Sequence, residues 1–234
     1  MMKSTTAEEM KLLEDLYPFI IPKYEEVHSM IVSLLDYPRE REIRVADLGC
    51  GFGGLTRRII EAFPVSAVFC LDANLQILQR MREKLSDLSD QFVIFHRNLE
   101  SNVWMQDMEH LNAVVSSFTL DYLTPERRKE VVGEAYQLLE PGGRWISCEF
   151  YRSPDARVNR IFHDLEIRFI QNALKQGEVT AEQIDQMSSS AVLRQEHHII
   201  AVDEKKHWLE EAGFKQVDVP WRFLNLAVIS GVKL

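Results

Sequence analysis

The sequence predicts an α/β protein with a doubly wound, mostly parallel sheet of seven strands. Short apolar runs alternate with amphipathic stretches of helical spacing through the middle of the chain, and this alternation is typical of a parallel sheet covered on both faces. The expected parallel strands are residues 43–47, 67–71, 92–95, 113–117 and 144–150. Two later runs, residues 216–223 and 227–233, are joined by a short turn. They must pair antiparallel, so the sheet is expected to end with a reversed strand.

The helices between these strands are expected at about residues 54–63, 74–86 and 125–139. The third has the clearest start, because Thr124 is a good N-cap and Pro125 suits the first helical position. The Pro-Gly-Gly sequence at residues 141–143 then stops it and turns the chain into the fifth strand. A last helix, at about residues 203–212, is expected to end at Gly213.

About fifty residues between the fifth strand and the last helix have a helical pattern of their own. Their apolar stripe consists of Val158, Ile161, Phe162, Leu165 and Phe169. Thr180 with Gln183 resembles a capping box that opens a second helix. The segment is too long for a simple crossover, so we expect it to form a cap over the carboxyl edge of the sheet, with the stripe as the core of that cap.

The composition of the chain limits the kinds of partner that it is expected to bind. The chain of 234 residues has a net charge of −9 and a pI near 5.3, which argues against tight binding of a nucleic-acid backbone. Acidic residues stand where a signal peptide would be apolar, and no stretch approaches the ~20 apolar residues of a membrane span. Three cysteines without close spacing fit reduced thiols. We expect a cytoplasmic protein with a small-molecule partner and no membrane association, and we leave a homodimer open.

The loop VADLGCGFGGLT, residues 45–56, satisfies two glycine fingerprints at once. Gly49, Gly51 and Gly54 match the dinucleotide pattern, whereas Gly49, Gly51 and Gly53 match that of S-adenosylmethionine (SAM) enzymes. Glycine spacing alone does not choose between these two cofactors.

One acid, Asp47, and the chain order favour SAM, whereas a second acid, Asp72, supports either ligand. Asp47 stands two residues before Gly49, where a carboxylate would repel the pyrophosphate of a dinucleotide but attract the ammonium and sulfonium of SAM. Asp72 ends the second strand, where it can accept both ribose hydroxyls of either ligand. Helices precede the first strand and an antiparallel hairpin closes the sheet, whereas a dinucleotide domain usually begins at its first strand.

The glycine loop is the first of five motifs that follow in order along the chain: VADLGCGFGG, CLDANLQIL, FHRNLE, AVVSSFTLDYL and LLEPGGRWISCEF. Together they resemble the successive motifs of the class I SAM-dependent methyltransferases, which have a Rossmann-like fold. IPKYEEVHSMI, SSFTLDYL and the ending WLEEAGFKQVDVPWRFLNLAVISGVK are similar, more narrowly, to carboxy-S-adenosylmethionine synthases and their methyltransferase relatives. This second likeness covers most of the chain.

The resemblance implies a set of cofactor-binding residues: Tyr24, Asp47, Gly49, Cys50, Gly51, Gly53, Asp72, Ala73, Asn98, Leu99, Ser116 and Ser117. Within this set, Asp72 would take the ribose hydroxyls, and Asn98 with Leu99 would lie at the edge and face of the adenine. The two serines at the end of the fourth strand would lie under the sulfonium, and Tyr24 would close over the amino-acid end.

Departures from the family pattern bear on the chemistry. Where the family often has Asp, this chain has Asn98, whose carbonyl oxygen can still accept from the adenine amino group. In carboxy-SAM synthases a cap arginine holds the additional carboxylate; the corresponding position falls among residues 188–190, all serines, and Ser117 stands where those enzymes have Asn. Arg194 would substitute only under a shifted alignment. Ordinary SAM is therefore the expected cofactor.

Substrates of open parallel sheets bind beyond the carboxyl ends of the strands. The residues there that could touch an acceptor are Asp121, Tyr122, Glu149, Tyr151 and Arg152. Asp121 could instead cap a helix, Tyr122 could be core packing and Arg152 a solvated loop charge. The adjacent His197 and His198, with His207 further on, lack the spacing of a metal site, so no metal is expected.

The domain organisation and the functional alternatives follow. Residues 1–42 are expected to form helices over the cofactor site, 43–150 the SAM-binding core, 151–202 the substrate cap, and 203–234 the last helix and hairpin. The leading hypothesis is methyl transfer from SAM to a small-molecule acceptor. An enzyme that modifies or cyclises SAM itself, and a non-catalytic SAM-binding module, remain as alternatives. The identity of the acceptor and the use of a general base stay open.

Overall fold

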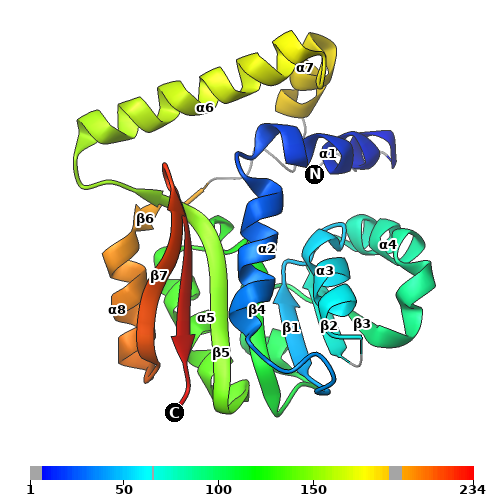
Figure 1. The fold of residues 1–234 in the computed structure, drawn as a ribbon, viewed down its shortest axis with the longest axis vertical. Coiled ribbons are helices and arrows are strands. Elements are labelled where there is room, and N and C mark those ends of the chain that lie inside the picture. Colours follow the sequence, from blue (N-terminus) through cyan, green and yellow to red (C-terminus); the bar gives the residue numbers. More distant parts are fainter. Residues whose placement is uncertain (1–6, 65, 190–196) are drawn as a thin grey trace.

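The computed structural model describes residues 7–64, 66–189 and 197–234 (Figure 1). A single sheet has the strand order β3-β2-β1-β4-β5-β8-β7, with the short β6 beside the end of β5. The strands are β1 (Arg44–Leu48), β2 (Ala67–Asp72), β3 (Phe92–His96), β4 (Leu111–Ser117), β5 (Leu139–Arg152), β6 (Ile200–Ala201), β7 (Lys215–Phe223) and β8 (Leu226–Val232). The strands up to β6 pair parallel, whereas β8 pairs antiparallel with both β5 and β7. The predicted fold class and reversed ending are confirmed; the short β6 was not predicted.

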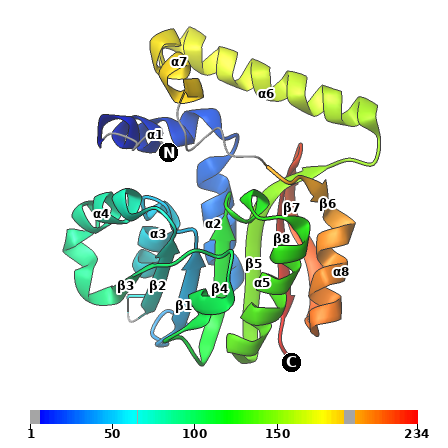
Figure 2. The same ribbon diagram turned by 180° about the vertical axis from the view of Figure 1, so that it is seen from behind.

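Helices cover both faces of the sheet (Figures 1 and 2). The helices are α1 (Ala7–Ile20), α2 (Tyr24–Leu35), α3 (Gly54–Ala62), α4 (Leu75–Lys84), α5 (Pro125–Leu138), α6 (Ala156–Gln176), α7 (Ala181–Ser189) and α8 (Val202–Ala212), with short 3-10 turns η1 (Ser86–Gln91), η2 (Asn102–Met105) and η3 (Leu120–Tyr122). α2, α3 and α4 pack on one face and α5 and α8 on the other. The predicted core helices lie within a few residues of the observed ones; the 3-10 turns were not predicted.

Two cores form because successive strand residues point to opposite faces. Val45 of β1 packs under α2 and α3, whereas its neighbour Ala46 packs with α5 and α8. β1 and β4 are buried on both faces, as expected of central parallel strands. The sheet is therefore a rigid support for the loops that follow its parallel strands.

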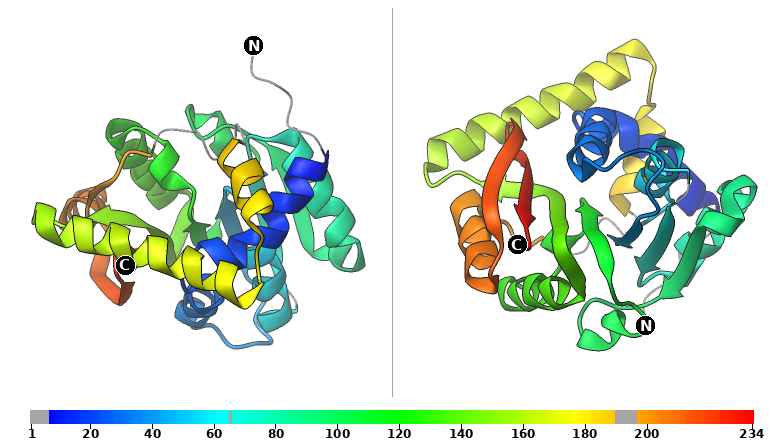
Figure 3. Two further views of the ribbon diagram at one scale, coloured as in Figure 1. Left: turned by 90° about the horizontal axis from the view of Figure 1, so that it is seen from above. Right: turned by 60° about the horizontal axis from the view of Figure 1, so that its bottom comes forward.

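A third core lies beyond the carboxyl ends of the parallel strands. Leu13 and Leu16 of α1 pack between Phe52 and Ile77 on one side and residues of α6 and α7 on the other. Seen from above, α1 and α7 cross this end of the molecule and α6 runs along it (Figure 3). α6 and α7 therefore contact α1, and α6 also contacts the turn between β7 and β8, where Asn225 Nδ2 donates to Glu166 Oε1 at 2.7 Å.

The apolar stripe of α6 is not the core that was predicted. Ala173 is the buried residue of this helix, whereas the side chains of Ile161 and Leu165 are 54% and 36% exposed. The physical reason is that the first turns of α6 run past the sheet with little to pack against (Figures 1 and 3).

Among the described residues, no helix combines the length and apolar character needed to cross a bilayer.

Candidate functional site

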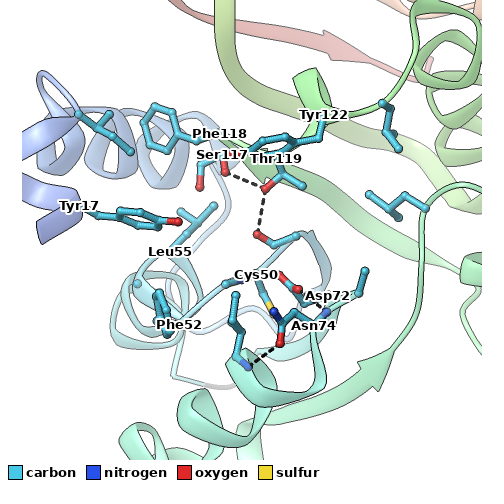
Figure 4. A pocket seen from close by; sticks show the side chains of 18 of the residues that line it. Tyr17, Cys50, Phe52, Leu55, Asp72, Asn74, Ser117, Phe118, Thr119 and Tyr122 are labelled. Carbon is cyan, nitrogen blue, oxygen red and sulfur yellow. Dashed lines mark hydrogen bonds between the residues drawn. The ribbon is translucent and has the colours of Figure 1, made fainter. Parts of the chain in front are cut away.

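A cavity of about 890 Å³ opens beyond the carboxyl ends of β1, β2 and β4. Its floor is the loop after β1 and its walls come from α1, α2, the ends of β2 and β4, and the chain around η3. Figure 4 shows Asp72, Asn74 and Cys50 on one side of the cavity and Ser117, Phe118 and Tyr122 on the opposite side. Segments distant in sequence therefore meet around one space large enough for small-molecule ligands.

The glycine loop lets the backbone itself form the floor. Gly49 has a φ of 69°, and a Cβ added there would clash with the side chain of Thr119. Thr119 Oγ1 lies 3.1 Å from the carbonyl oxygens of both Gly49 and Ser117, and so ties the β1 loop to the end of β4. A Cβ on Gly51 would meet nothing within 4 Å, which leaves open space above its backbone. Gly53 does not line the cavity; it has a φ of 79° as the N-cap of α3 and packs under Leu85.

Asp72 ends β2 and presents its carboxylate to the cavity. The backbone N–H of Gly51 donates to Oδ2 at 3.2 Å and that of Asn74 to Oδ1 at 2.8 Å. Burial raises the pKa of this carboxyl group, while these two N–H groups act in the opposite direction. Each oxygen keeps a lone pair for a ligand hydroxyl, so the geometry fits the predicted ribose contact.

Asp47 lies behind the loop and not at the surface of the cavity. Its side chain is buried, Thr56 Oγ1 donates to Oδ2 at 2.7 Å, and Oδ1 has no hydrogen-bond partner. Burial raises its pKa to about 7. The prediction that Asp47 directly faces the ligand is therefore corrected: its charge would act through the glycine loop.

Asn98 and Leu99 line the end of the cavity nearest Asp72. Arg127 of α5 fixes this segment, since its Nε donates to the carbonyl oxygen of Leu99 at 2.6 Å and its Nη2 pairs with Glu134 at 2.7 Å. Asn98 Oδ1 accepts from the backbone N–H of Glu100 at 2.9 Å. One lone pair of the predicted adenine acceptor is thus already used to shape the turn.

The wall contributed by α2 is aromatic. Tyr24 stacks on Phe118 at a centroid distance of 5.7 Å and contacts the ring of His28 at 4.3 Å. His28 Nε2 lies 3.3 Å from Ser117 Oγ, and burial lowers the pKa of His28 to about 4, so the ring is neutral at physiological pH. His28 was missed from the sequence; the signal available was its position four residues, about one helical turn, after Tyr24.

A second polar group lies around η3 and the segment before β6. Asp121 is fully buried, and His197 Nδ1 lies 2.8 Å from its Oδ2. His197 and Tyr122 both line the cavity, with ring centroids 4.3 Å apart. The sequence singled out Asp121 and Tyr122 as acceptor candidates, but treated His197 only as a rejected metal ligand.

Other predicted residues do not reach the cavity. Ser116 is buried and donates to the carbonyl oxygen of Leu48 at 2.8 Å. Tyr151 is buried in the core under α5 and α8, and Arg152 is exposed outside the cavity lining. Glu149 is fully buried in an ion cluster with Arg128 and Lys205. The corrections for Glu149, Tyr151 and Arg152 share one cause: β5 extends to residue 152 and pairs with β6 and β8 instead of ending at the cavity.

The predicted cofactor residues that the structure brings together around the cavity are Tyr24, Gly49, Cys50, Gly51, Asp72, Ala73, Asn98, Leu99 and Ser117. Ser188 is exposed on α7, whereas Ser190 and Arg194 lie outside the described residues. His207 is on the surface of α8, 3.3 Å from Glu211. Within the described ranges, no three His, Cys, Asp or Glu side chains cluster as metal ligands would.

Comparison with known proteins gives the family. Residues 45–143 match the family model of a methyltransferase domain. This stretch contains the glycine loop, Asp72, the adenine-side turn and the end of β4 described above. The comparison therefore shows a methyltransferase domain in the middle of the chain. Residues outside the match add the N-terminal helices, the α6–α7 segment and the closing hairpin to this methyltransferase core.

Solved methyltransferases share the fold at low identity. Human N-acetylserotonin methyltransferase, solved in complex with SAM, superposes with a TM-score of 0.65 at 13% identity, over 97% of this chain and 56% of that one. Magnesium protoporphyrin IX methyltransferase from Synechocystis, solved with bound SAH, gives a TM-score of 0.65 at 13% identity, over 97% and 95% of the two chains. At such identities the likeness concerns the fold alone.

Relatives found by sequence similarity are named carboxy-S-adenosyl-L-methionine synthases. Carboxy-S-adenosyl-L-methionine synthase from Pectobacterium atrosepticum is 25% identical over 226 residues, which cover 94% of this chain and 88% of that protein. The enzyme of the same name from Klebsiella pneumoniae is 24% identical over 226 residues, at 95% and 88% coverage. The likeness therefore extends over nearly the whole chain, including the regions outside the family match.

Proposed function

We propose that this chain transfers a methyl group from SAM to a small-molecule acceptor held in the same cavity. The observation that carries the proposal is Asp72, whose carboxylate is oriented by the N–H groups of Gly51 and Asn74 and still has lone pairs facing the cavity. An acid at the end of the second strand is the ribose-binding device of open parallel sheets. Asp47 is buried behind the glycine loop. Its carboxylate would repel the pyrophosphate of a dinucleotide and attract a cationic nucleoside.

The residues around the cavity fit SAM. A Cβ at Gly51 would meet nothing within 4 Å, so a ligand could approach the loop closely. The predicted contacts would place Asn98 and Leu99 at the adenine, Asp72 at the ribose and Tyr24 over the amino-acid end. SAM supplies a methyl group on a sulfonium that is an excellent leaving group. The chain must then mainly hold the acceptor in line, and such alignment lowers a barrier by about 7–11 kcal/mol.

Aromatic side chains would assist by excluding water and facing the cation. Tyr24 and Phe118 stack beside Ser117, and Tyr17 closes the wall from α1. Burial raises the pKa of Tyr17 to about 12, so its ring remains the neutral phenol. Aromatic faces attract cations most strongly where water is excluded. These rings would therefore favour SAM over its uncharged product.

Modification of SAM itself is the second candidate, favoured by the names of the sequence relatives. The chain departs from those enzymes where their cap arginine stands, because the corresponding position falls among residues 188–190, which are all neutral serines. This departure favours ordinary methyl transfer. Incubation with SAM alone separates the two: a product formed from SAM without any acceptor would support the second candidate, and intact SAM would oppose it.

The proposed function is tested by calorimetry and by turnover. The wild-type protein should bind SAM and SAH, and Asp72→Ala should lose about 10–100-fold in affinity, because hydrogen bonds to a charged group are worth about 1.5–3 kcal/mol. Asp90→Ala, an exposed acid of η1, is the matched control. Labelled SAM with a panel of hydroxyl, thiol, amine and carboxylate acceptors should yield SAH and a methylated product. Failure of the wild-type protein to bind either ligand would overturn the proposal.

A further inference from the structure

We propose that His197 is the general base of this site and that the acceptor is a hydroxyl compound of the phenol class. The inference rests on the proposed methyl transfer and adds the nucleophile and the proton acceptor. It starts from the pair formed by His197 and Asp121, which join across 76 residues of sequence at a distance of 2.8 Å.

The pair fixes which nitrogen of His197 is free. A carboxylate can only accept hydrogen bonds, so Asp121 Oδ2 holds the proton on Nδ1 and leaves the lone pair on Nε2. Asp121 is fully buried, whereas the side chain of His197 is 33% exposed at the cavity. A buried acid that orients an accessible imidazole is the arrangement of a general base, because it sets the tautomer and stabilises the imidazolium after proton transfer.

The backbone around His197 is anchored to the same elements. The N–H of His198 donates to the carbonyl oxygen of Asp121 at 2.7 Å. Arg128 Nη2, from α5, donates to the carbonyl oxygen of His198 at 2.7 Å. Two backbone contacts and the side-chain pair therefore fix the imidazole relative to η3. Such positioning is needed for proton transfer, and a histidine that only filled space would not require it.

The surroundings of His197 fit a flat, apolar acceptor. The Tyr122 ring lies 4.3 Å from that of His197, and the Phe150 ring lies 6.4 Å away at an interplanar angle of 88°. Phe150 in turn contacts Phe118 at 6.2 Å, and all these rings line the cavity. Aromatic walls favour an aromatic ring, so the hydroxyl compound that matches this side of the cavity is a phenol.

The other charged groups nearby are paired with one another, which leaves Asp121 as the acidic partner of His197. Glu149 of β5 is neutralised by Arg128 at 3.3 Å and Lys205 of α8 at 3.0 Å, all fully buried. Tyr122 has a pKa raised by burial and stays a neutral phenol. His28, on the other side of Ser117, is also neutral and lacks a carboxylate partner. Three of the described histidines line the cavity; Nε2 of the third, His96, lies 3.0 Å from the carbonyl oxygen of Ala73, and His197 is the one hydrogen-bonded to a carboxylate.

The step balances as follows. Nε2 of His197 takes the proton of the acceptor hydroxyl, and the oxygen uses the electron pair of that O–H bond to attack the methyl carbon of SAM. An O–C bond forms, the C–S bond breaks, and its electron pair passes to the sulfur, which becomes a neutral thioether. The imidazolium is stabilised by Asp121 until its proton leaves to solvent. A phenol needs this help because it is a weak acid that is almost wholly un-ionised at neutral pH.

The direct test uses the absorbance of 4-nitrophenol bound to the protein–SAH complex, at a pH where the free probe is the neutral phenol. The wild-type protein should convert the bound probe to the phenolate, as proton transfer to His197 requires. His197→Gln keeps a donor for Asp121 but has no basic nitrogen, so its bound probe should remain neutral. Asp121→Asn should reduce the phenolate fraction. His207→Gln, on the surface of α8, is the control.

Turnover adds a readout that a purely structural role would not change. Methylation of a series of phenols should fall about 10²–10⁴-fold in His197→Gln for the least acidic members. The loss should shrink as the phenol becomes acidic enough to ionise unaided. An equal loss across the series would overturn the assignment, because misplacement of the acceptor affects all members alike.

The outcomes also separate this inference from the proposed function. A wild-type complex that binds SAH but holds the probe as the neutral phenol, or does not bind it, overturns the inference and leaves methyl transfer standing. Methylation confined to amine or carboxylate acceptors does the same. Absence of SAM and SAH binding overturns the proposed function, whereas phenolate formation that depends on His197 would still support the base.

Discussion

Two buried ionisable residues beside the cavity have pKa values shifted toward their neutral forms. Burial lowers the pKa of His28 to about 4 and raises that of Asp47 to about 7. In both cases the dominant cause is the loss of water around the charged form. A site prepared for a cationic ligand thus contains an acid that is partly protonated near neutral pH and a histidine that resists protonation.

His28 should make the protein less stable in mild acid. Its pKa is 6.5 when solvated and about 4 when folded, so the unfolded chain binds more protons between these values. Stability from this group is complete above pH 6.5 and is lost as the pH falls toward 4, by up to ~3 kcal/mol. Urea denaturation at several pH values should show a smaller loss in His28→Gln than in wild type. Equal slopes for the two proteins would contradict the shift.

Asp47→Asn should stabilise the ligand-free protein and weaken SAM binding. The carboxyl pKa rises from 3.8 to about 7 on folding, so its destabilising effect grows as the pH increases between these values and is complete above pH 7. At pH 8 we expect a gain on the order of 2 kcal/mol, less than the shift alone implies because the new amide needs an acceptor. Denaturation measures the gain and calorimetry the lost affinity. Unchanged SAM affinity would remove Asp47 from the cofactor-binding set.

At the scale of elements, local chemistry was predictable. Thr124 Oγ1 accepts from the N–H of Arg127 at the start of α5, as its N-cap role predicts. Thr180 and Gln183 form the predicted reciprocal capping box at the start of α7, at 2.8 and 3.1 Å. These features depend on residues a few positions apart, so the sequence contains all the information needed to find them.

Pairings between distant elements were not predictable in the same way. The contact of Asp121 with His197 depends on β6 lying beside the end of β5, and no local pattern encodes that pairing. The apolar stripe of α6 has the spacing of a buried face, yet Ile161 remains exposed because burial depends on what lies opposite. Periodicity predicts that a helix exists and which side is apolar, but not its partner.

Glu149 should hold α5 and α8 to the sheet. Its carboxylate lies between Arg128 of α5 and Lys205 of α8, all fully buried. Glu149→Gln would leave two buried cations without this partner, at a cost of about 3–5 kcal/mol. Glu140→Gln, which removes a partly exposed acid of the same strand, should cost about 1 kcal/mol or less. Similar denaturation midpoints for the two variants would show that the cluster does not stabilise the fold.

At the scale of the whole molecule, the mostly parallel sheet and its reversed ending followed from the order of the strand and helix patterns. The cofactor side of the cavity was also largely predictable, because Asp72 and the glycine loop stand at strand ends, where parallel sheets bind ligands. The opposite side of the cavity was less predictable from the sequence. Tyr151 and Arg152 also stand at a strand end, but β5 is covered there by its neighbours.

Ligand binding should stabilise the entire fold, since the cavity joins α1 and α2 to the sheet. SAH at one hundred times its dissociation constant should add ~2.7 kcal/mol. For a chain of this size that corresponds to a rise in melting temperature of about 5–10 °C, measurable by thermal denaturation. Asp72→Ala at the same SAH concentration should show a much smaller rise. An equal rise in both proteins would place the ligand elsewhere.

The order in which the chain is synthesised sets a condition on how the site can assemble. Tyr17, Tyr24 and His28 belong to helices that precede every strand of the sheet. α2, however, packs against β4, β5 and β8, and β8 follows every other strand along the chain. On the ribosome, the α1 and α2 wall of the cavity emerges first and then stays without its full support until β8 has been synthesised. The apolar face of α2 is therefore open to chaperones until that point.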